Sequence, residues 1–313
     1  MIVRWGLDQL GPLLREVGVE RSFLIASERW HDFDSVGRWS EVPTDRIEEV
    51  AGAAAEADGL LAVGGGSAID LAKAVSATTG APLVSVPTTY SGAEWTTYFG
   101  VRDPGRRMKG GGGGARLAGI VYEPELTLGL PRAESGGTAM NALAHCAEAL
   151  YVNGHNPAAD AHALGGATLI GDWLPRVVDA PDDLAARQQL LQGAMHGGAA
   201  LGGSMLALGH AMAQALGGRY GLPHGAMNAL CLPQALEFNE EVAPGAVRRF
   251  RDAIGADVRE LARLGGFERL RDFGVPEQDL REIAAATVER AGAKANPREA
   301  SAADVERLLH NIY

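Results

Sequence analysis

Three histidines after Pro131, namely His145, His210 and His224, suggest a site for proton transfer or ligand binding. His145 follows Asn141 by four residues and His210 precedes Gln214 by four, so each pair lies on one face of a helix. His224 stands at a turn before another helical pattern. Imidazole titrates near neutral pH and also binds transition metals. A single histidine is more often structural, but we predict that these three histidines and Asn141 share one site.

A run of glycines in the first half predicts a phosphate-binding loop. An apolar run is followed by Gly64, Gly65, Gly66 and Ser67, and then by a helical pattern. Glycine lets a backbone approach a pyrophosphate closely, and the next helix offers free N–H groups and the positive end of its dipole. The spacing is not GxGxxG, so the alternative is a plain strand-to-helix turn.

Three more side chains follow apolar runs that resemble strands. Thr88 and Thr89 come after residues 82–87, and Glu28 comes after residues 21–26. In open α/β sheets, ligands bind at the carboxyl ends of the strands. The two hydroxyls are therefore candidates for binding phosphate or ribose oxygens, and the carboxylate for binding ribose hydroxyls. The alternatives are two residues that simply close a strand and a solvated surface acid.

The elements that would position these residues are indicated by short apolar runs alternating with helical patterns. The predicted strands are residues 21–26, 60–63 and 82–87, and the predicted helices are residues 44–57 and 68–77. Thr44 is the expected N-cap of the first helix. Strands that alternate with helices are typical of βαβ units, so we expect an α/β domain with a parallel sheet.

The composition changes after Pro131 to long stretches rich in alanine and leucine, with helical spacing and few β-branched residues. The predicted helices lie at residues 138–151, 158–174, 184–200 and 205–216. This pattern is typical of an all-α domain. We therefore expect an α/β domain at residues 1–132 and a helical domain at residues 133–313.

Five consecutive glycines at residues 110–114 form the one low-complexity segment. Glycine in regular structure costs roughly 0.5–1 kcal/mol per residue relative to alanine, so the segment is expected to be mobile unless something holds it. Lys109 precedes it, and Arg106, Arg107 and Arg116 flank it. One hypothesis is a lid that closes over the dinucleotide, with Lys109 on a phosphate. The alternative is a flexible hairpin tip without a role.

The charge and the cysteine content exclude several classes of protein. The 313 residues carry a net charge of −11, which disfavours nucleic acid as a partner. Cys146 and Cys231 do not form a CxxC pair, which favours a reducing compartment over a disulfide scaffold. We find no signal peptide, and no apolar run reaches the ~18 residues of a membrane span. A cytoplasmic protein without a membrane partner is expected.

Taken together, the motifs resemble the iron-containing alcohol dehydrogenase superfamily, in particular its maleylacetate reductase branch. The resemblance rests on the glycine loop, the threonine segment, the connection between the two halves and the histidine segments. The matching residues are 64–73, 87–96, 123–131, 141–145, 148–151, 210–218, 222–225 and 228–229. They occur in the family's order and cover most of residues 1–240, which makes the combination specific.

The resemblance implies the dehydroquinate synthase-like fold of that family, with a Rossmann-like dinucleotide-binding domain and an all-α catalytic domain. It implies an oxidoreductase that uses NAD or NADP, acts on a small molecule and forms a homodimer. It implies that Gly65, Gly66, Ser67, Thr88 and Thr89 contact the dinucleotide, as Gly64, Glu28 and Lys109 are also expected to do, and that Tyr90 is catalytic. Glu28 favours NAD, whereas the adjacent Arg29 would suit the 2′-phosphate of NADP.

The resemblance also bears on a metal site. Metal-dependent members hold the ion with an aspartate and three histidines, and these positions match Asn141, His145, His210 and His224. Asparagine is a poorer ligand for a hard cation than aspartate, and maleylacetate reductases, which also have asparagine there, work without a metal. We therefore predict an NAD(P)H-dependent reductase that transfers hydride to a small unsaturated oxo-acid or carbonyl compound without a metal.

Two alternatives stay open. His145, His210 and His224 alone are able to hold Fe or Zn, which would give a metal-dependent alcohol dehydrogenase. The chain also departs from the reductase branch next to His210 and after His224. These departures leave open a repurposed scaffold that binds a ligand but transfers no hydride.

Overall fold

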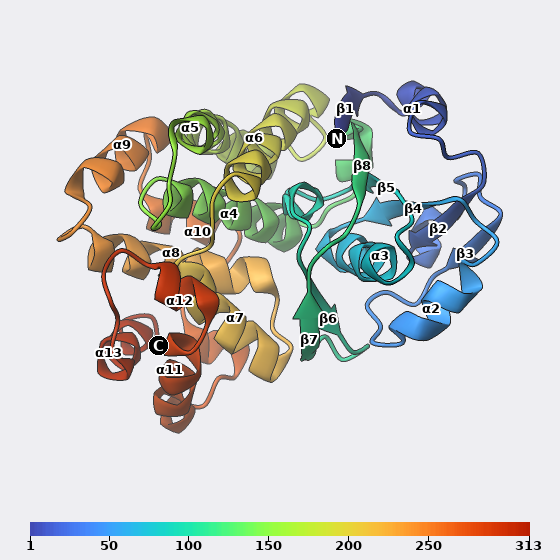
Figure 1. Ribbon diagram of the computed structural model, residues 1–313. Coiled ribbons are helices and arrows are strands. Elements are labelled where there is room, and N and C mark those ends of the chain that lie inside the picture. The colour runs from blue at the N-terminus through green and yellow to red at the C-terminus, as the bar shows by residue number, and fades with distance from the viewer. The chain divides into compact units, whose positions relative to one another are not determined.

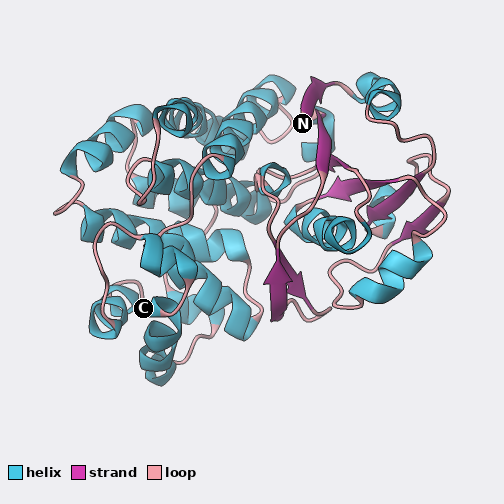
Figure 2. Cartoon of the chain, viewed as in Figure 1, coloured by secondary structure: helices cyan, strands magenta, loops and turns pink.

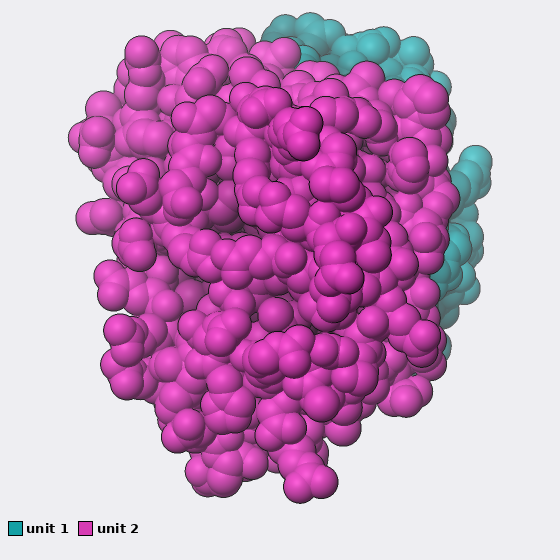
Figure 3. All heavy atoms as spheres, turned by 90° about the vertical axis from the view of Figure 1, so that its left-hand side faces the viewer, with its two compact units in different colours: residues 1–127 teal, residues 128–313 magenta.

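The chain forms two compact units, Met1–Thr127 and Leu128–Tyr313, which Figure 3 shows in separate colours. The computed structural model describes all residues, 1–313. The boundary predicted from the sequence falls between residues 132 and 133, one residue into helix α4 (Arg132–Ala149). Both positions lie at the ends of the short connection that leads into α4.

Unit 1 is built on a six-stranded sheet with the order β1-β8-β5-β4-β2-β3 (Figures 1 and 2). All neighbouring strands are parallel. The strands are β1 (Ile2–Trp5), β2 (Ser22–Ala26), β3 (Gly37–Trp39), β4 (Gly59–Gly64), β5 (Leu83–Pro87) and β8 (Leu117–Tyr122). The predicted parallel α/β fold is confirmed. Local sequence patterns do not predict β1 and β3, which are short edge strands, or β8, which pairs with β1 and β5.

Helices cover both faces of this sheet. They are α1 (Leu10–Glu16), α2 (Ile47–Ala53) and α3 (Gly66–Thr79). Because side chains alternate along a strand, Phe23 packs in one core cluster with Val50 of α2 and Ile69 of α3. Leu24 packs in a second cluster with Leu13 of α1. The continuous burial of β2, β4 and β5 follows from this double cover.

Helix α2 is shorter than the sequence predicts, and the assignment of Thr44 as its N-cap is wrong. The prediction spans residues 44–57, whereas the helix begins at Ile47 and has Arg46 at its N-cap position. The hydroxyl of Thr44 accepts a hydrogen bond from the backbone N–H of Arg46, at 3.4 Å. It therefore supports a local turn before the helix instead of capping the helix itself.

The glycine run belongs largely to a strand. β6 (Phe99–Arg102) pairs with β7 (Met108–Gly112) in a separate, antiparallel two-stranded sheet. A Cβ atom at Gly111 would lie 2.8 Å from the carbonyl oxygen of Phe99, so this pairing requires glycine. The interpretation of the glycines as the tip of a hairpin is wrong, because residues 103–107 form the tip.

Unit 2 is all-α, as predicted (Figure 2). Its helices are α4 (Arg132–Ala149), α5 (Pro157–Asp179), α6 (Leu184–Gly202), α7 (Leu208–Tyr220), α8 (His224–Asn239), α9 (Pro244–Ile254), α10 (Val258–Leu264), α11 (Leu280–Val288), α12 (Ala291–Ala295) and α13 (Ala302–His310). The four predicted helical stretches overlap α4, α5, α6 and α7. None of the helices has the length and apolar character needed to cross a bilayer.

Helix α4 packs against α5, α6 and α8 and is buried over most of its length. Two glycines allow its neighbours to approach closely. A Cβ atom at Gly197 of α6 would lie 2.7 Å from the carbonyl oxygen of Ala142, and one at Gly166 of α5 would lie 2.7 Å from Sγ of Cys146. This packing places the polar residues of α4 inside the core of the helical unit.

Candidate active site

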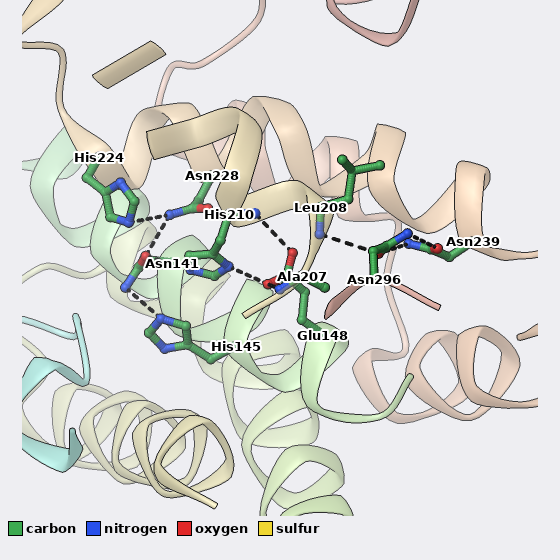
Figure 4. Close-up of polar contacts among 10 residues, drawn as sticks. All are labelled: Asn141, His145, Glu148, Ala207, Leu208, His210, His224, Asn228, Asn239 and Asn296. Carbon is green, nitrogen blue, oxygen red and sulfur yellow. Dashed lines mark hydrogen bonds and ion pairs between the residues drawn. The ribbon is translucent and has the colours of Figure 1, made fainter. Parts of the chain in front are cut away.

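Helices α4, α7 and α8 bring Asn141, His145, His210 and His224 together in unit 2 (Figure 4). The rings of His145 and His210 stack with their centroids 4.7 Å apart and an interplanar angle of 14°. The ring centroids of His210 and His224 are 5.8 Å apart. His145 is 5% exposed and His210 is 1% exposed, whereas His224 is only partly buried, so solvent reaches the cluster at His224.

The side-chain amides of Asn141 and Asn228 link the three imidazoles. Oδ1 of Asn141 accepts a hydrogen bond from Nδ2 of Asn228 at 2.7 Å and lies 3.3 Å from Nε2 of His210. Nδ2 of Asn141 lies 3.5 Å from Nε2 of His145, and Nδ2 of Asn228 lies 3.0 Å from Nε2 of His224. Each Nε2 atom therefore faces an amide group.

The buried carboxylate of Glu148 orients His210. It accepts hydrogen bonds from Nδ1 of His210 at 2.8 Å, from the backbone N–H of His210 at 3.0 Å and from the backbone N–H of Ala207 at 2.7 Å. Ala207 is the N-cap residue of α7 and has no polar side chain with which to cap the helix. Glu148 supplies that acceptor and places a negative charge at the positive end of the helix dipole.

The C-terminal segment holds the same end of α7. Oδ1 of Asn296 accepts from the backbone N–H of Leu208 at 3.4 Å. Asn296 also exchanges two side-chain hydrogen bonds with Asn239 of α8, at 3.0 and 2.7 Å (Figure 4). The first turn of α7, which carries His210, is thus fixed by Glu148 of α4 and by Asn296.

Asn228 and Glu148 are not among the site residues predicted from the sequence. Asn228 follows His224 by four residues on α8, the same spacing that singled out Asn141 and His145, so this signal was available. Glu148 acts on a residue of another helix, and no local pattern reveals that contact. The sequence pairs His210 with Gln214, whereas the structure directs Nε2 of His210 toward Asn141.

We expect Glu148→Gln to lower the free energy of unfolding by about 1–3 kcal/mol, because one acceptor oxygen becomes an NH2 group that faces N–H donors. Urea unfolding of the parent and the variant measures this difference. Glu289→Gln is the matched control, since the Glu289 side chain is 78% exposed. If both variants are as stable as the parent, Glu148 does not hold α7 as described.

Two buried polar atoms in the cluster lack a hydrogen-bond partner, namely Nδ1 of His145 and Oδ1 of Asn228. Burial, together with the neighbouring His210 and His224, holds the pKa of His145 well below its usual value, so this imidazole is neutral at pH 7. When Nε2 of His145 accepts from Asn141, its Nδ1 carries the proton and is a donor. The cluster therefore offers a ligand one donor and one acceptor.

The arrangement does not fit the metal ion that the resemblance associates with these histidines. Amide N–H groups face the Nε2 atoms of His145 and His224, and a nitrogen that accepts such a hydrogen bond cannot give the same lone pair to a metal. No group of three or more histidine, cysteine, aspartate or glutamate residues is arranged to hold an ion. In this arrangement the cluster presents hydrogen-bond donors and acceptors to a ligand.

The predicted phosphate loop lies at the carboxyl edge of the sheet in unit 1. β4 ends at Gly64, and Thr88 donates its backbone N–H to the carbonyl oxygen of Gly64 at 3.0 Å. A Cβ atom at Gly65 would lie 2.8 Å from Cγ2 of Thr89, so this glycine allows the two segments to touch. At Gly66, the first residue of α3, a Cβ atom would have Oγ of Ser91 as its nearest neighbour outside the helix, at 3.6 Å. Ser67 follows in the first turn of α3.

Glu28 and Lys109 have partners elsewhere in unit 1. The carboxylate of Glu28 pairs with Arg38 at 2.8 Å, and Nζ of Lys109 pairs with Asp103 at 3.0 Å. The hydrogen bond from Lys109 lowers the pKa of the Asp103 carboxyl. The roles of Glu28 and Lys109 toward a dinucleotide stay predictions.

Tyr90 is fully buried, and its hydroxyl donates to Oγ1 of Thr127 at 3.3 Å. A phenol held in this way is not available to a substrate unless the contact opens. The catalytic role that the sequence predicts for Tyr90 therefore gains no support from this geometry.

Two family models match the chain. One is described as "Fe-containing alcohol dehydrogenase family, C-terminal" and covers residues 136–313, and the other is described as "Iron-containing alcohol dehydrogenase" and covers residues 26–117. The maleylacetate reductase of Pseudomonas knackmussii is 36% identical, over 88% of this chain and 80% of its own length. That of Pseudomonas sp. (strain P51) is 31% identical, over 98% of this chain and 93% of its own length.

Solved structures show the same likeness. The iron-containing alcohol dehydrogenase from Corynebacterium glutamicum matches with a TM-score of 0.88 at 30% identity, covering 100% of this chain and 94% of its own. The maleylacetate reductase from Rhizobium sp. strain MTP-10005 matches with a TM-score of 0.88 at 27% identity, covering 100% of this chain and 95% of its own.

Proposed function

The chain belongs to the iron-containing alcohol dehydrogenase family, and we propose that it is an NAD(P)H-dependent reductase of the maleylacetate reductase type that works without a metal. Its substrate is a small unsaturated oxo-acid or carbonyl compound. The observation that carries this proposal is the pair of amides, Asn141 and Asn228, that faces all three histidine Nε2 atoms. This arrangement suits binding and protonation of an oxygen atom.

In this proposal, unit 1 binds the dinucleotide at the loop between β4 and α3. The backbone at Gly65 and Gly66 approaches the pyrophosphate, and the N-terminus of α3 contributes free N–H groups and the positive end of its dipole. Thr88 and Thr89 follow β5 beside this loop and bind phosphate or ribose oxygens. The reduced nicotinamide, when bound, supplies the hydride.

His210 is the proposed proton donor. Its Nδ1 contacts the Glu148 carboxylate, and its Nε2 faces Oδ1 of Asn141, which is also an acceptor. Both contacts are hydrogen bonds when the ring carries a proton on each nitrogen, and Glu148 balances the resulting charge. In that state His210 donates its Nε2 proton to the substrate oxygen as hydride reaches the neighbouring carbon.

His145 and Asn228 are proposed to orient the substrate. Nδ1 of His145 is a free donor and Oδ1 of Asn228 is a free acceptor. An unsatisfied buried polar group costs about 1–3 kcal/mol, so a substrate oxygen or hydroxyl that meets these atoms gains binding energy.

Metal content and activity test the proposal together. Protein purified without chelators is analysed for Fe and Zn, and NADH and NADPH oxidation is followed with maleylacetate, with and without EDTA. We expect little bound metal and activity that EDTA does not remove. Stoichiometric metal with activity lost on chelation would identify a metal-dependent alcohol dehydrogenase instead. Fluorescence titration with NADH and NADPH tests the remaining alternative: if neither nucleotide binds, the chain is a scaffold without hydride transfer.

The β6–β7 ribbon provides a separate prediction about the cofactor. Residues 109–114 are exposed and Lys109 is held only at the hairpin tip, by Asp103. If the ribbon orders over the dinucleotide, NADH or NADPH slows hydrogen exchange across residues 106–116. Lys109→Ala then weakens cofactor binding by up to about fivefold, which corresponds to ~1 kcal/mol for an exposed ion pair.

The matched control is Lys294→Ala, which removes an exposed lysine that pairs with Glu289 in unit 2. Exchange across residues 106–116 that saturating cofactor leaves unchanged would show that the ribbon is not a lid.

A further inference from the structure

A second pair of histidines lies outside the candidate active site, on the neighbouring helices α5 and α6 (Figure 1). Nδ1 of His162 is 2.9 Å from Nδ1 of His196, and the ring centroids are 5.1 Å apart. His162 is exposed and His196 is partly buried, so the pair is open to solvent on one side. The packing of α5 against α6 holds the two rings at this separation.

Two imidazole nitrogens that face each other at 2.9 Å are stable only with a proton or a cation between them. Two lone pairs would repel, so either one ring is the Nδ1–H tautomer and donates a hydrogen bond to the other, or a cation lies between the two nitrogens. Burial and the neighbouring His162 lower the pKa of His196, which keeps its lone pair free of a second proton at neutral pH. Neutral imidazole is a ligand for divalent transition metals.

The separation also favours a particular coordination geometry. Two nitrogens bound to one ion at about 2.0–2.1 Å, with an angle of about 90–110° between them, lie about 2.9–3.4 Å apart. The observed 2.9 Å falls at the 90° end of this range. Neighbouring ligands at 90° are typical of tetragonal Cu²⁺ and Ni²⁺, whereas Zn²⁺ prefers the wider tetrahedral angle.

We propose that His162 and His196 form a binding site for Cu²⁺ or Ni²⁺ that bridges α5 and α6. The two Nδ1 atoms are the protein ligands. No third histidine, cysteine, aspartate or glutamate joins them, so water completes the coordination and the ion exchanges with solvent. The site does not depend on the proposed reductase activity, because it shares no residue with the His210 cluster.

Titration of the full-length, untagged protein with Ni²⁺ or Cu²⁺ tests the proposal. Calorimetry compares the parent with His162→Ala and His196→Ala, and His155→Ala is the matched control because it removes another exposed histidine, which pairs with Asp160. We expect the parent and the control to bind one ion with the same affinity. Each of the other two variants should bind it about tenfold or more weakly, since each loses the chelate. Ni²⁺ should also raise the melting temperature of the parent but not of the two variants.

Electron paramagnetic resonance of bound Cu²⁺ gives an independent readout. Hyperfine coupling to two nitrogens is expected in the parent and to at most one in His162→Ala. If the parent and both variants bind Ni²⁺ and Cu²⁺ with the same stoichiometry and affinity, the pair shares only a proton and the proposed site is wrong.

Discussion

Replacing Gly66 with valine is expected to weaken NADH and NADPH binding by about a hundredfold or more, a loss of roughly 2.7 kcal/mol, without unfolding the protein. Gly66 is the first residue of α3, where the proposed pyrophosphate site meets the helix N-terminus. A Cβ atom there would lie 3.6 Å from Oγ of Ser91 and 3.9 Å from Cβ of Ala93, which are ordinary contacts. The fold therefore has room for the side chain, whereas a phosphate that approaches the backbone does not.

The neighbouring glycines would not give a clean test. Gly64 has a φ of 151°, and a Cβ atom at Gly65 would clash with Thr89. Gly52→Val is a suitable control, because a Cβ atom at this exposed position of α2 has no neighbour within 4 Å. Nucleotide titration by fluorescence and a thermal melt of each variant separate binding from folding. Parent-like affinity in Gly66→Val would remove the phosphate loop from the proposal.

The substitution Asn141→Asp is expected to raise the affinity of the histidine cluster for Zn²⁺ or Fe²⁺ by at least about tenfold, or ~1.4 kcal/mol. Oδ1 of Asn141 already serves as an acceptor toward Asn228 and His210. In aspartate, the second oxygen replaces the NH2 group that faces Nε2 of His145, and two acceptors then face each other. A cation relieves this repulsion and balances the buried charge.

Metal titration of the parent and the variant measures the change, and unfolding in the absence of metal gives a second readout. We expect the metal-free variant to be less stable than the parent, because its new carboxylate is buried without a full counter-charge. Gln188→Glu introduces the same charge at an exposed position and serves as the control. Equal metal affinity in Asn141→Asp and the parent would show that residue 141 does not control ligation by the histidines.

Much of the fold follows from local patterns in the sequence. The apolar runs around β2, β4 and β5 predict buried parallel strands, because a strand covered by helices on both faces must be apolar on both. The alanine- and leucine-rich second half predicts helices, because its apolar residues recur with helical spacing. The glycine loop before α3 and the four-residue spacing of Asn141 and His145 also depend only on neighbours in the chain.

The tertiary structure decides what these elements meet. The sequence shows that Glu148 lies on a helix, but only the packing of α4 against α7 makes it the acceptor for Ala207 and His210. Likewise, the sequence of the glycine run predicts a mobile loop, and only its pairing with Phe99 and the rest of β6 makes most of it a strand. Helical or strand periodicity determines which face of an element is buried, whereas the partner across that face is set by residues far away in the chain. Hydrogen bonds and strand pairing between such distant residues therefore appear only once the elements have packed.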